Sequence, residues 1–278
     1  MSAVLEVLKK EIENTQIVSP VGGRGSRSIP MQVVSLLRKT MGDKILNEIY
    51  MPKHLLEVHG KPLIQRFIEQ FKGVGFKEFV FLLGNGSEEI ENFLGNGDKF
   101  GVEIRYSYDP PLKKIGKGKA ILNALKKGII DRNKRSIIAF PDDLILYEYA
   151  PIELLIRHLH SKKKDKRIVA TLLLSPYIKS PYGIAEVEGI KIINFKEKPN
   201  IPLFANTGIS IIDPEGYEYI ERLIDLSSPE PIEIESTVYP VLAKEGRLGY
   251  TFLPSGEDWI AVNSLKDLLR AEKVLTDQ

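Results

Sequence analysis

Helix-like and strand-like segments alternate through most of this 278-residue chain, and that order limits the folds it can adopt. The segment 62–72 places apolar residues at helical spacing, and the run FKEFVFLLGN at 76–85 is rich in the aromatic and branched residues of buried strands. Helix–strand pairs of the same kind follow at 88–94 and 102–108, at 120–128 and 136–140, and at 152–160 and 167–175. This alternation predicts an α/β fold in three layers, α/β/α, with a mostly parallel sheet in the middle.

The two ends of the chain complete the predicted order of elements. Residues 3–13 have the spacing of a helix, within an N-terminal segment 1–15, and residues 16–21 form a short strand. The run YGIAEVEGIKIINFKEKP from residue 182 alternates around Gly189, as in an antiparallel hairpin. A strand at 206–213, a helix at 214–225 and a last helix at 264–276 follow. With no internal repeat and no low-complexity linker, the sequence predicts one domain over 1–278.

The composition argues against several classes of partner and compartment. Because 39 basic residues face 37 acidic ones, the formal net charge is only +2, and we expect neither nucleic acid nor a membrane surface as a partner. The absence of cysteine excludes disulfides and thiolate metal sites and fits a reducing compartment. No apolar run approaches the roughly 20 residues of a membrane span, and the acid-containing N-terminus does not resemble a secretory signal. We therefore expect a cytoplasmic protein, with no further domain after the last helix.

The stretch VSPVGGRGSRSIP at 18–30 combines backbone freedom with positive charge. A glycine-rich turn after a strand lets backbone N–H groups approach a phosphate, and Arg24 and Arg27 would add donors for its oxygens. A tight surface turn is the plainer interpretation. The dinucleotide fingerprint G-x-G-x-x-G fails because Ser28 stands at its third glycine, which disfavours a dehydrogenase. The P-loop pattern fails because no Gly-Lys-Ser/Thr follows.

Six further stretches follow this loop in a fixed order. They are MPKHLLEVHGKPLIQ at 51–65, GKGKA at 116–120, FPDDLIL at 140–146, YGIAEV at 182–187, FKEKP at 195–199 and ANTGISI at 205–211. In this order they resemble the sugar-1-phosphate nucleotidyltransferases, and most closely the bacterial-type UTP–glucose-1-phosphate uridylyltransferases. The loop matches that group's V-x-P-x-x-G-x-G-T-R-x-x-P at Val18, Pro20, Gly23, Gly25, Arg27 and Pro30, with Ser26 in place of Thr. The resemblance extends over about residues 16 to 275.

The resemblance implies a fold, a reaction and a cofactor. The fold is a Rossmann-like nucleotidyltransferase sheet with a small antiparallel sugar-binding hairpin region. The reaction moves a nucleotidyl group, most closely UMP from UTP, to a sugar 1-phosphate, most closely glucose 1-phosphate, and releases pyrophosphate. The implied cofactor is Mg²⁺. Because two polyanions must meet, such a site needs cations on both sides, and positioning with charge neutralisation supplies most of the catalysis.

Five side chains receive chemical roles from this resemblance. Arg27 would hold the β- and γ-phosphates, Lys53 would neutralise the triphosphate, and Asp142 would hold Mg²⁺ against the α-phosphate. Lys198 would bind the phosphate of the incoming sugar phosphate, and Glu197 would accept hydrogen bonds from sugar hydroxyls. As isolated residues they would instead be solvated charges, or in the case of Asp142 a turn or helix cap.

A further set of positions is implied to line the two substrates. Nucleotide contacts are expected at Val21, Gly22, Gly23, Gly25, Ser26, Arg27, Asp109, Gly116 and Gly118, and sugar contacts at Gly183, Glu197 and Asn206. The glycines would let the backbone come close to the nucleotide.

Several positions depart from the family pattern. Ala261 stands where a second metal-binding aspartate is usual; in an extended segment Asn263 would share its face and Asp258 would not, so Asn263, water or phosphate would complete the coordination. The glutamine that reads the base is missing, and the same stretch offers Asp109, which puts uracil specificity in question. His54 stands where an acid is usual, and the four histidines of the chain form no metal-ligand spacing.

The segment between the glycine loop and Lys53 is longer than the corresponding loop of the family. Its apolar run predicts a helical insertion over 31–50, acting as a lid or a subunit contact beside the triphosphate.

Three functions remain open at this point. The first is uridylyl transfer to glucose 1-phosphate, and the second is the same fold with dTTP or another nucleotide and sugar. The third is a non-catalytic nucleotide-sugar-binding regulatory protein, which Ala261 favours. We also expect a homo-oligomer.

Overall fold

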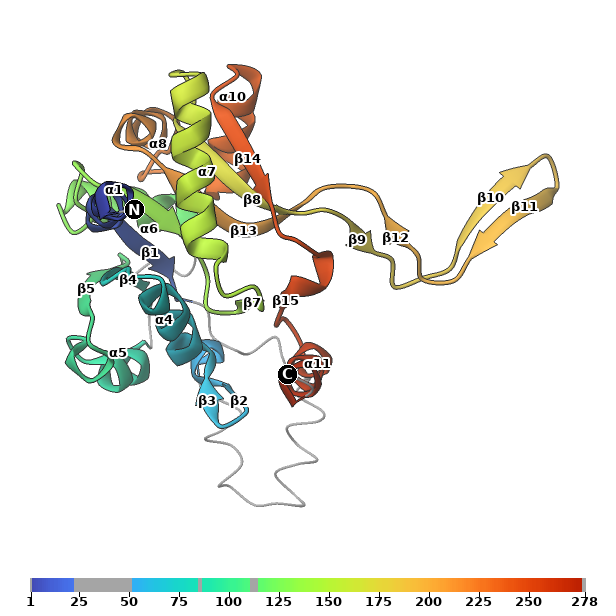
Figure 1. Cartoon of the computed structure of the whole chain (residues 1–278), viewed down its shortest axis with the longest axis horizontal. Coiled ribbons are helices and arrows are strands. Elements are labelled where there is room, and N and C mark those ends of the chain that lie inside the picture. The colour runs from blue at the N-terminus through green and yellow to red at the C-terminus, as the bar shows by residue number, and fades with distance from the viewer. Residues whose placement is uncertain (1, 23–51, 85–86, 111–114, 277–278) are drawn as a thin grey trace.

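A seven-stranded sheet forms the centre of the computed structural model, which describes residues 2–22, 52–84, 87–110 and 115–276 (Figure 1). Its order is β14-β8-β13-β6-β1-β4-β5. The bounds are β1 (Thr15–Pro20), β4 (Glu78–Leu83), β5 (Glu103–Tyr108), β6 (Arg135–Ile138), β8 (Ala170–Ser175), β13 (Ala205–Ile212) and β14 (Leu248–Phe252). Only β13 runs antiparallel to its neighbours in this sheet, so the predicted mostly parallel sheet is confirmed.

Helices cover both faces of this sheet, because its strands present apolar side chains in both directions. In β1, Ile17 belongs to one apolar cluster and Val18 to the other, as expected for a parallel sheet buried on two sides. The first cluster includes α4 (Leu63–Gly73), α5 (Glu88–Leu94) and α7 (Ala150–Lys164); the second includes α6 (Lys117–Lys126), α8 (Tyr217–Leu223), α9 (Ile234–Thr237) and α10 (Tyr239–Lys244). The three-layer prediction is therefore confirmed.

Short elements that the sequence did not predict surround the carboxyl ends of the central strands. The hairpin β2 (Glu57–Val58) with β3 (Lys61–Pro62), and the pair β7 (Asp143–Ile145) with β15 (Trp259–Ala261), are both antiparallel. The last helix, α11 (Leu265–Thr276), packs Ala271 on Val58 and Ile260 in a third apolar cluster. Short 3-10 turns complete the chain: η2 (Lys53–Leu55), η3 (Asp98–Phe100), η4 (Pro214–Gly216) and η5 (Gly256–Asp258). The predicted insertion over 31–50 lies outside the described residues.

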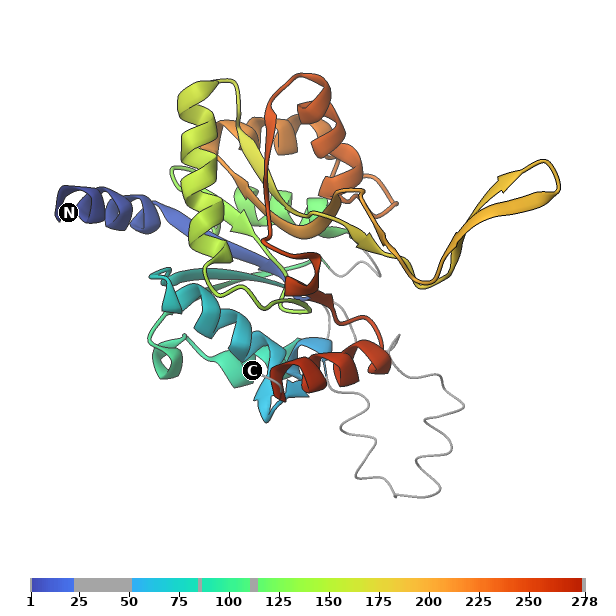
Figure 2. The ribbon, with the colours of Figure 1, turned by 45° about the vertical axis from the view of Figure 1, so that its right-hand side comes forward.

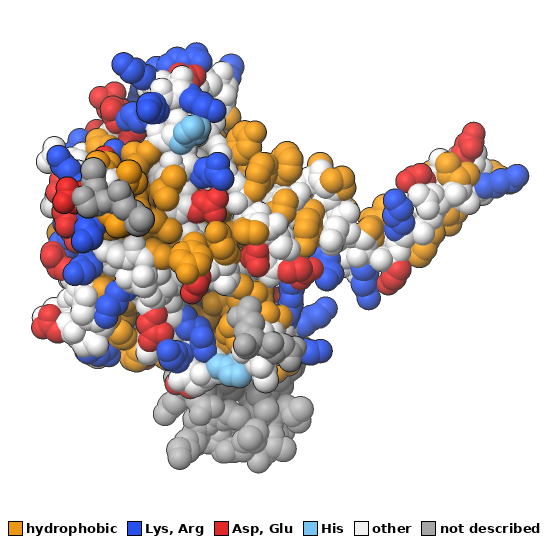
Figure 3. Space-filling model, viewed as in Figure 1, with side chains coloured by type: hydrophobic (Ala, Val, Ile, Leu, Met, Phe, Trp, Pro, Cys, Tyr) orange, Lys and Arg blue, Asp and Glu red, His pale blue; other side chains and the backbone are white. Residues whose placement is uncertain are grey.

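The predicted antiparallel hairpin is present as a long arm. β10 (Ile184–Glu188) pairs with β11 (Lys191–Lys196) around Gly189, and β9 (Ile178–Lys179) pairs with β12 (Asn200–Ile201) at its base. Figures 1 and 2 show the arm projecting from the body of the protein. Figure 3 shows apolar side chains along it; its exposed apolar residues are Ile178, Tyr182, Ile184, Val187, Ile190, Ile192, Ile193, Phe195, Leu203 and Phe204.

The predicted N-terminal helix is α1 (Ser2–Glu13), which leads directly into β1 (Figure 2). Among the residues the structure describes, no helix is long and apolar enough to cross a membrane.

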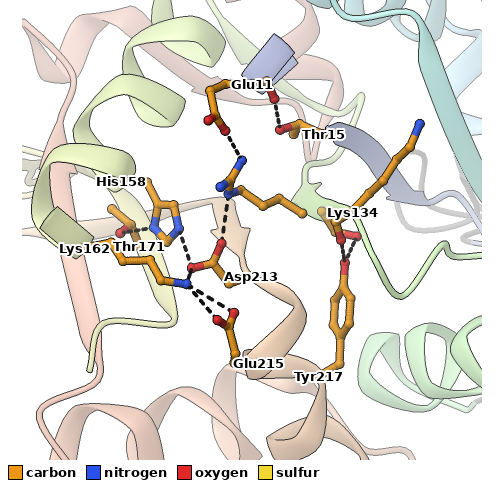
Figure 4. Close-up of polar contacts among 11 residues, drawn as sticks. Glu11, Thr15, Lys134, His158, Lys162, Thr171, Asp213, Glu215 and Tyr217 are labelled. Atoms are coloured by element: carbon orange, nitrogen blue, oxygen red, sulfur yellow. Dashed lines mark hydrogen bonds and ion pairs between the residues drawn. The ribbon is translucent and has the colours of Figure 1, made fainter. Parts of the chain in front are cut away.

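Asp213, directly after β13, is the centre of a buried ionic cluster (Figure 4). Its carboxylate oxygens lie 3.1 Å from His158 Nε2, 2.6 Å from Lys162 Nζ and 2.9 Å from Arg135 Nε. Burial would raise the pKa of Asp213, but His158 and Lys162 lower it to about 2. The cluster joins α7, β6 and β13 at the amino-terminal edge of the parallel strands.

This cluster also extends to the first helix of the chain. Arg135 Nη1 donates to Glu11 Oε2 at 2.5 Å, and the other ring nitrogen of His158 lies 2.9 Å from Thr171 Oγ1. Because Arg135 contacts both Glu11 and Asp213, α1 is tied to the sheet through charge as well as through packing.

We expect Asp213→Asn to lower the free energy of unfolding at pH 7 by about 3 kcal/mol, since two cations and a histidine lose their buried carboxylate. The folded-state pKa of about 2 lies below the ordinary 3.8, so this stabilisation is present above about pH 4 and is lost as the pH falls toward 2. Urea unfolding of the unmodified protein and of Asp213→Asn at pH 7 and pH 3 measures this stabilisation. The difference between their free energies of unfolding should be smaller at pH 3 than at pH 7.

Glu215→Gln is the matched control, because Glu215 pairs with the same Lys162 but its side chain is 62% exposed. It should cost less than about 1 kcal/mol. Equal losses in the two variants would contradict the central role of Asp213.

Candidate active site

The carboxyl ends of β6, β1, β4 and β5 lie along one edge of the sheet, because these four neighbours run parallel. Ligands of open α/β sheets bind at this edge. The chain reaches the edge after β6 with the stretch Phe140, Pro141 and Asp142, and after β1 with Val21 and Gly22. The candidate site is therefore built from the segments that follow these strands.

Three polar side chains from distant parts of the chain converge here. Lys53, at the start of η2, places Nζ 2.6 Å from Asp142 Oδ2 and 3.0 Å from Asn263 Oδ1. The pairing of β15 with β7 sets this arrangement, because Ala261 lies opposite Asp143 and the N–H of Val262 donates to the carbonyl of Asp142 at 2.8 Å. The strand β15 ends at Ala261 and the N–H of Asn263 donates to the carbonyl of Ala261 at 3.0 Å, so the chain turns here, and the role of Asn263 in metal coordination stays a prediction.

Asp258, which the sequence analysis set aside as a replacement for the second metal-binding aspartate, stabilises a turn. Its Oδ2 accepts from the backbone N–H of Ser255 at 2.8 Å, and Ser255 in turn accepts from Glu257 in a capping box at η5. Asp258 is thus engaged in fixing the turn that precedes β15.

Neighbouring side chains favour the ionised form of the Asp142 carboxylate. Burial would raise the pKa of Asp142, but His54 and Lys53 outweigh it, and the pKa is lowered. His54 is itself buried, and burial lowers its pKa, so the Lys53 ammonium is the charge that acts on Asp142 at neutral pH. His54 Nδ1 has no hydrogen-bond partner among the described residues.

Asp143 faces away from this ion pair but belongs to the same site. Its Oδ1 accepts from Trp259 Nε1 at 2.9 Å, and a Cβ added to Gly208 would lie 2.9 Å from its Oδ2. Burial and the charge of Asp142 raise the pKa of Asp143 to about 7. Two adjacent carboxyl groups thus have pKa values shifted in opposite directions, which is common where chemistry takes place.

Asn206 reaches the site through the backbone of Gly208. Asn206 Oδ1 accepts from the N–H of Gly208 at 3.2 Å, and Gly208 contacts Asp143 and Phe140. Lys117, at the start of α6, lies over the ring of Phe140 with Nζ 4.7 Å from the centroid. Lys117 brings a second positive charge close to Asp143, but its ammonium is already paired with Glu235 Oε1.

The donor set fits a magnesium ion that is shared with a substrate. A carboxylate oxygen of Asp142 and the amide oxygen of Asn263 both face one cation, the Lys53 ammonium, and both are hard oxygen donors. Within the described ranges no three Asp, Glu or His side chains are grouped so that they could hold a metal alone. Mg²⁺ commonly takes one or two protein oxygens and completes its shell with phosphates and water.

The described part of the glycine loop lies beside Asp109. Val21 is buried, and its N–H donates to the carbonyl of Leu82 at 2.9 Å. Gly22 packs against Gly84 so closely that a Cβ on Gly22 would lie 3.0 Å from Gly84 N, and 3.6 Å from Asp109 Oδ2. The expected positions Gly23, Gly25, Ser26 and Arg27 lie outside the described residues.

Gly116 and Gly118 contact protein backbone at the start of α6. A Cβ on Gly116, whose φ is +79°, would lie 2.4 Å from the carbonyl oxygen of Ile232, and a Cβ on Gly118 would lie 2.8 Å from the same atom. Close packing of the 232–233 segment therefore explains these two glycines, and their approach to a nucleotide stays a prediction.

The sugar-side residues lie on the arm and away from this cluster. Lys198 has a φ of +44°, and its Nζ lies 3.5 Å from Glu197 Oε1, with both side chains more than 60% exposed. Gly183 lies next to Glu197, since a Cβ added to Gly183 would lie 2.4 Å from Phe195 Cζ and 2.9 Å from Glu197 Oε2. The structure does not bring Lys198, Glu197 or Gly183 into contact with Lys53 or Asp142.

Sequence reasoning missed two contributors to the site. Lys117 lies inside the GKGKA motif, of which the sequence analysis considered only the two glycines. Trp259 lies two residues before Ala261. A signal existed for both, because each flanks a motif residue. Asp143, which follows Asp142 in the FPDDLIL stretch, accepts from Trp259 and lies close to Gly208.

Comparisons with known proteins identify the family. Residues 49–278 match the model of the family described as nucleotidyl transferase. A UTP–glucose-1-phosphate uridylyltransferase of Synechocystis is 26% identical over 80% of this chain and 57% of its own length. Mannose-1-phosphate guanyltransferase of Yarrowia lipolytica is 30% identical over 90% of this chain and 61% of its own, and a probable guanylyltransferase of rice is 27% identical over 92% and 63%. The chain thus spans less than two thirds of these relatives.

Solved structures agree on the fold. A Bacillus anthracis protein described as a glucose-1-phosphate thymidylyltransferase, in complex with sucrose, superimposes with a TM-score of 0.66 at 23% identity, over 95% of this chain and 96% of that one. A UDP-glucose pyrophosphorylase complexed with UDP-glucose gives a TM-score of 0.61 at 20% identity, over 95% and 98%. The family match over most of the chain, the shared fold and the acidic and basic side chains at the carboxyl edge lead to one conclusion: this chain belongs to the nucleotidyl transferase family.

Proposed function

We propose that this protein transfers a nucleotidyl group from a nucleoside triphosphate to a sugar 1-phosphate and releases pyrophosphate. The observation that carries the proposal is the contact of Lys53 with Asp142 and Asn263 at the carboxyl edge of the sheet, in a chain of this family. A phosphate oxygen of the sugar 1-phosphate forms the new bond to the α-phosphorus, and the bond from that phosphorus to pyrophosphate breaks.

The described side chains supply charge and position to this step. The Lys53 ammonium can turn from Asp142 to a phosphate oxygen, because both are anionic acceptors within reach of the same flexible stem. Lys117, over the ring of Phe140, would provide a second cation near the transferred group if its ammonium left Glu235. Asp142 and Asn263 would hold Mg²⁺, which neutralises phosphate charge when bound.

Two substrate pairs are supported by different observations. The sequence motifs favour UTP with glucose 1-phosphate, as in the named activity of the Synechocystis relative. The guanylyltransferase relatives and the carboxylate at Asp109 favour GTP with mannose 1-phosphate. Ala261 favours the regulatory alternative, and the oxygen that Asn263 directs at Lys53 supports catalysis over it.

The roles of Arg27 and Lys198 are part of this proposal. Lys198 would approach the site when the arm bends toward the body, and the short β9–β12 pair at the base of the arm is where such a bend would occur. A homo-oligomer and a cytoplasmic location are also proposed, as the sequence predicts.

A panel of nucleoside triphosphates and sugar 1-phosphates with Mg²⁺, followed by pyrophosphate release, tests the reaction. Asp142→Asn should lower kcat by about 100-fold or more, because the charge that holds the ion is lost. The thermal unfolding midpoint serves as the check on folding. Turnover within a factor of about two of the unmodified protein would refute the role of Asp142.

Asn263 offers a test of the second oxygen. Asn263→Ala should raise the Mg²⁺ concentration for half-maximal turnover by about tenfold, and Asn263→Asp should lower it, since a carboxylate is the stronger ligand. Mn²⁺ binding in the presence of nucleotide gives a readout independent of turnover. Asp258→Asn is the control and should leave the metal requirement unchanged, because Asp258 caps η5.

Lys198 can be tested against a neighbour on the same arm. Lys198→Ala should raise KM for the sugar 1-phosphate by about tenfold and leave KM for the triphosphate unchanged, since a charged hydrogen bond to one substrate is removed. Lys196→Ala, also exposed, should change neither constant. Equal effects of the two substitutions would mean that general charge on the arm, and no specific contact, explains the binding.

A further inference from the structure

The hairpin β2–β3, which begins four residues after Lys53, turns through two residues with left-handed backbone. His59 has a φ of +51° and Gly60 one of +64°, and Val58 pairs with Lys61 around them. Two-residue hairpin turns of this kind favour Asn, Asp or Gly at the first position, because other side chains strain a left-handed backbone. The turn itself therefore does not explain a histidine at position 59.

The contacts of His59 with α11 offer an explanation. Its Nε2 lies 3.0 Å from the carbonyl oxygen of Glu272 and 2.7 Å from Thr276 Oγ1. Because a carbonyl oxygen can only accept, Nε2 carries a proton and donates to Glu272. The backbone N–H of His59 donates to Glu272 Oε1 at 3.0 Å, and Oε2 of the same carboxylate lies 3.5 Å from Nε2. The backbone and the side chain of His59 thus both contact one residue of α11.

Neighbouring contacts fix the hairpin between two helices. Ala271 of α11 is buried in the apolar cluster that contains Val58 and Ile260. From α4, Arg66 Nε donates to the carbonyl of Val58 at 2.9 Å. Figures 1 and 2 both show α11 beside the hairpin. The position of the turn therefore depends on α11 as well as on α4.

The other end of α11 is joined to Asn263 of the candidate site. The N–H of Asn263 donates to Asp267 Oδ2 at 3.1 Å, and Ser264 Oγ donates to the same oxygen at 2.7 Å. Asp267 lies in the first turn of α11, so the backbone of Asn263 is tied to this helix. The amide oxygen of Asn263 in turn lies 3.0 Å from Lys53 Nζ.

Two polar contacts thus join the segment η2–β2 to the segment around α11 at opposite ends. Lys53 meets Asn263 at one end, and His59 meets Glu272 at the other. The first contact is the one that the proposed function exchanges, because Lys53 turns to a phosphate oxygen. The second contact contains no group that is proposed to touch a substrate, so it can persist during that exchange.

Resting on the proposed nucleotidyl transfer, we propose that His59 and Glu272 are positioning residues, which hold the amide oxygen of Asn263 at the cation site after Lys53 has turned to the triphosphate. They act through α11 and do not touch the substrates. Their side chains are 37% and 38% exposed, and an exposed pair contributes little to the free energy of unfolding. Loss of the contact should therefore affect metal binding more than stability.

His59→Asn tests the proposal without weakening the turn, because asparagine suits the left-handed position but is shorter than the imidazole that reaches α11. It should raise the Mg²⁺ concentration for half-maximal turnover by about fivefold, which is less than the effect of removing the Asn263 side chain itself. The thermal unfolding midpoint should equal or exceed that of the unmodified protein, since the strain of the turn is relieved.

Fluorescence of Trp259 gives a readout that does not depend on turnover. Trp259 is the only tryptophan of the chain, and its Nε1 donates to Asp143 beside the cation site. Quenching by Mn²⁺ in the presence of UTP, and separately of GTP, measures binding of the ion with each nucleotide. In His59→Asn the dissociation constant should rise by about the same factor as the Mg²⁺ requirement.

A second variant lies outside the turn. Glu272→Ala should give the same shift, and Glu272→Gln should retain most of the affinity, because its amide oxygen still accepts from the N–H of His59. The double variant His59→Asn with Glu272→Ala should bind no more weakly than the weaker single variant, since both changes remove one contact. Lys273→Ala is the matched control, because Lys273 is an exposed neighbour on α11, and it should change neither constant.

The outcomes separate the positioning role from the reaction. An unchanged Mg²⁺ requirement and unchanged Mn²⁺ binding in His59→Asn, or equal shifts in Lys273→Ala, would overturn the positioning role and leave nucleotidyl transfer standing. Unfolding midpoints that fall in proportion to the lost affinity in both His59→Asn and Glu272→Ala would also overturn it, because the contact would then be structural only. No turnover with any substrate pair, together with weaker Mn²⁺ binding in His59→Asn, would overturn nucleotidyl transfer and support the positioning role. No Mn²⁺ binding with either nucleotide would overturn both.

Discussion

The ion pair between Lys53 and Asp142 is the interaction on which the rest of the site depends. Their side chains are only 15% and 24% exposed, so each charge requires the other while no substrate is bound. A buried pair of this kind contributes little net stability, because desolvation offsets most of the attraction. Under the proposed function, each partner would be replaced when substrate binds: phosphate oxygens would accept from Lys53, and a cation would bind the carboxylate of Asp142. In that function, the pair would hold both groups charged and in place for substrates that are themselves charged.

The central sheet could be predicted from the sequence because its strands are buried on both faces and read as continuous apolar runs between amphipathic helices. Pairs such as β7 with β15 could not, since three residues show no period. That pair nevertheless decides the site, because it places Asn263 against Lys53. The choice of Asn263 over Asp258 was available from the two-residue alternation of an extended chain. The contact of Asn263 with Lys53, which lies 210 positions away in the chain, could not be predicted from that alternation.

Motif order gave the candidate site residues but not the distances between them. Lys53 and Asp142 are fixed by elements that pack on the body, and the structure brings them together. Lys198 follows β11 on a two-stranded arm whose base is a pair of two-residue strands. Only two pairs of residues form this ladder at the base of the arm. The positive φ of Lys198 is a backbone cost at the point where a phosphate contact is expected.

Asp109 and the Lys53–Asp142–Asn263 cluster lie at the ends of different strands, and this separation has a consequence for how the edge can vary. The backbone that positions Asp109 comes from β4, β5 and α6, and none of these elements carries Lys53, Asp142 or Asn263. A substitution at position 109 can therefore change this strand end without disturbing the contact of Lys53 with Asp142 and Asn263. Parallel strands make this possible, because each one delivers its own loop to the shared carboxyl edge and is held in place by its neighbours rather than by the other loops.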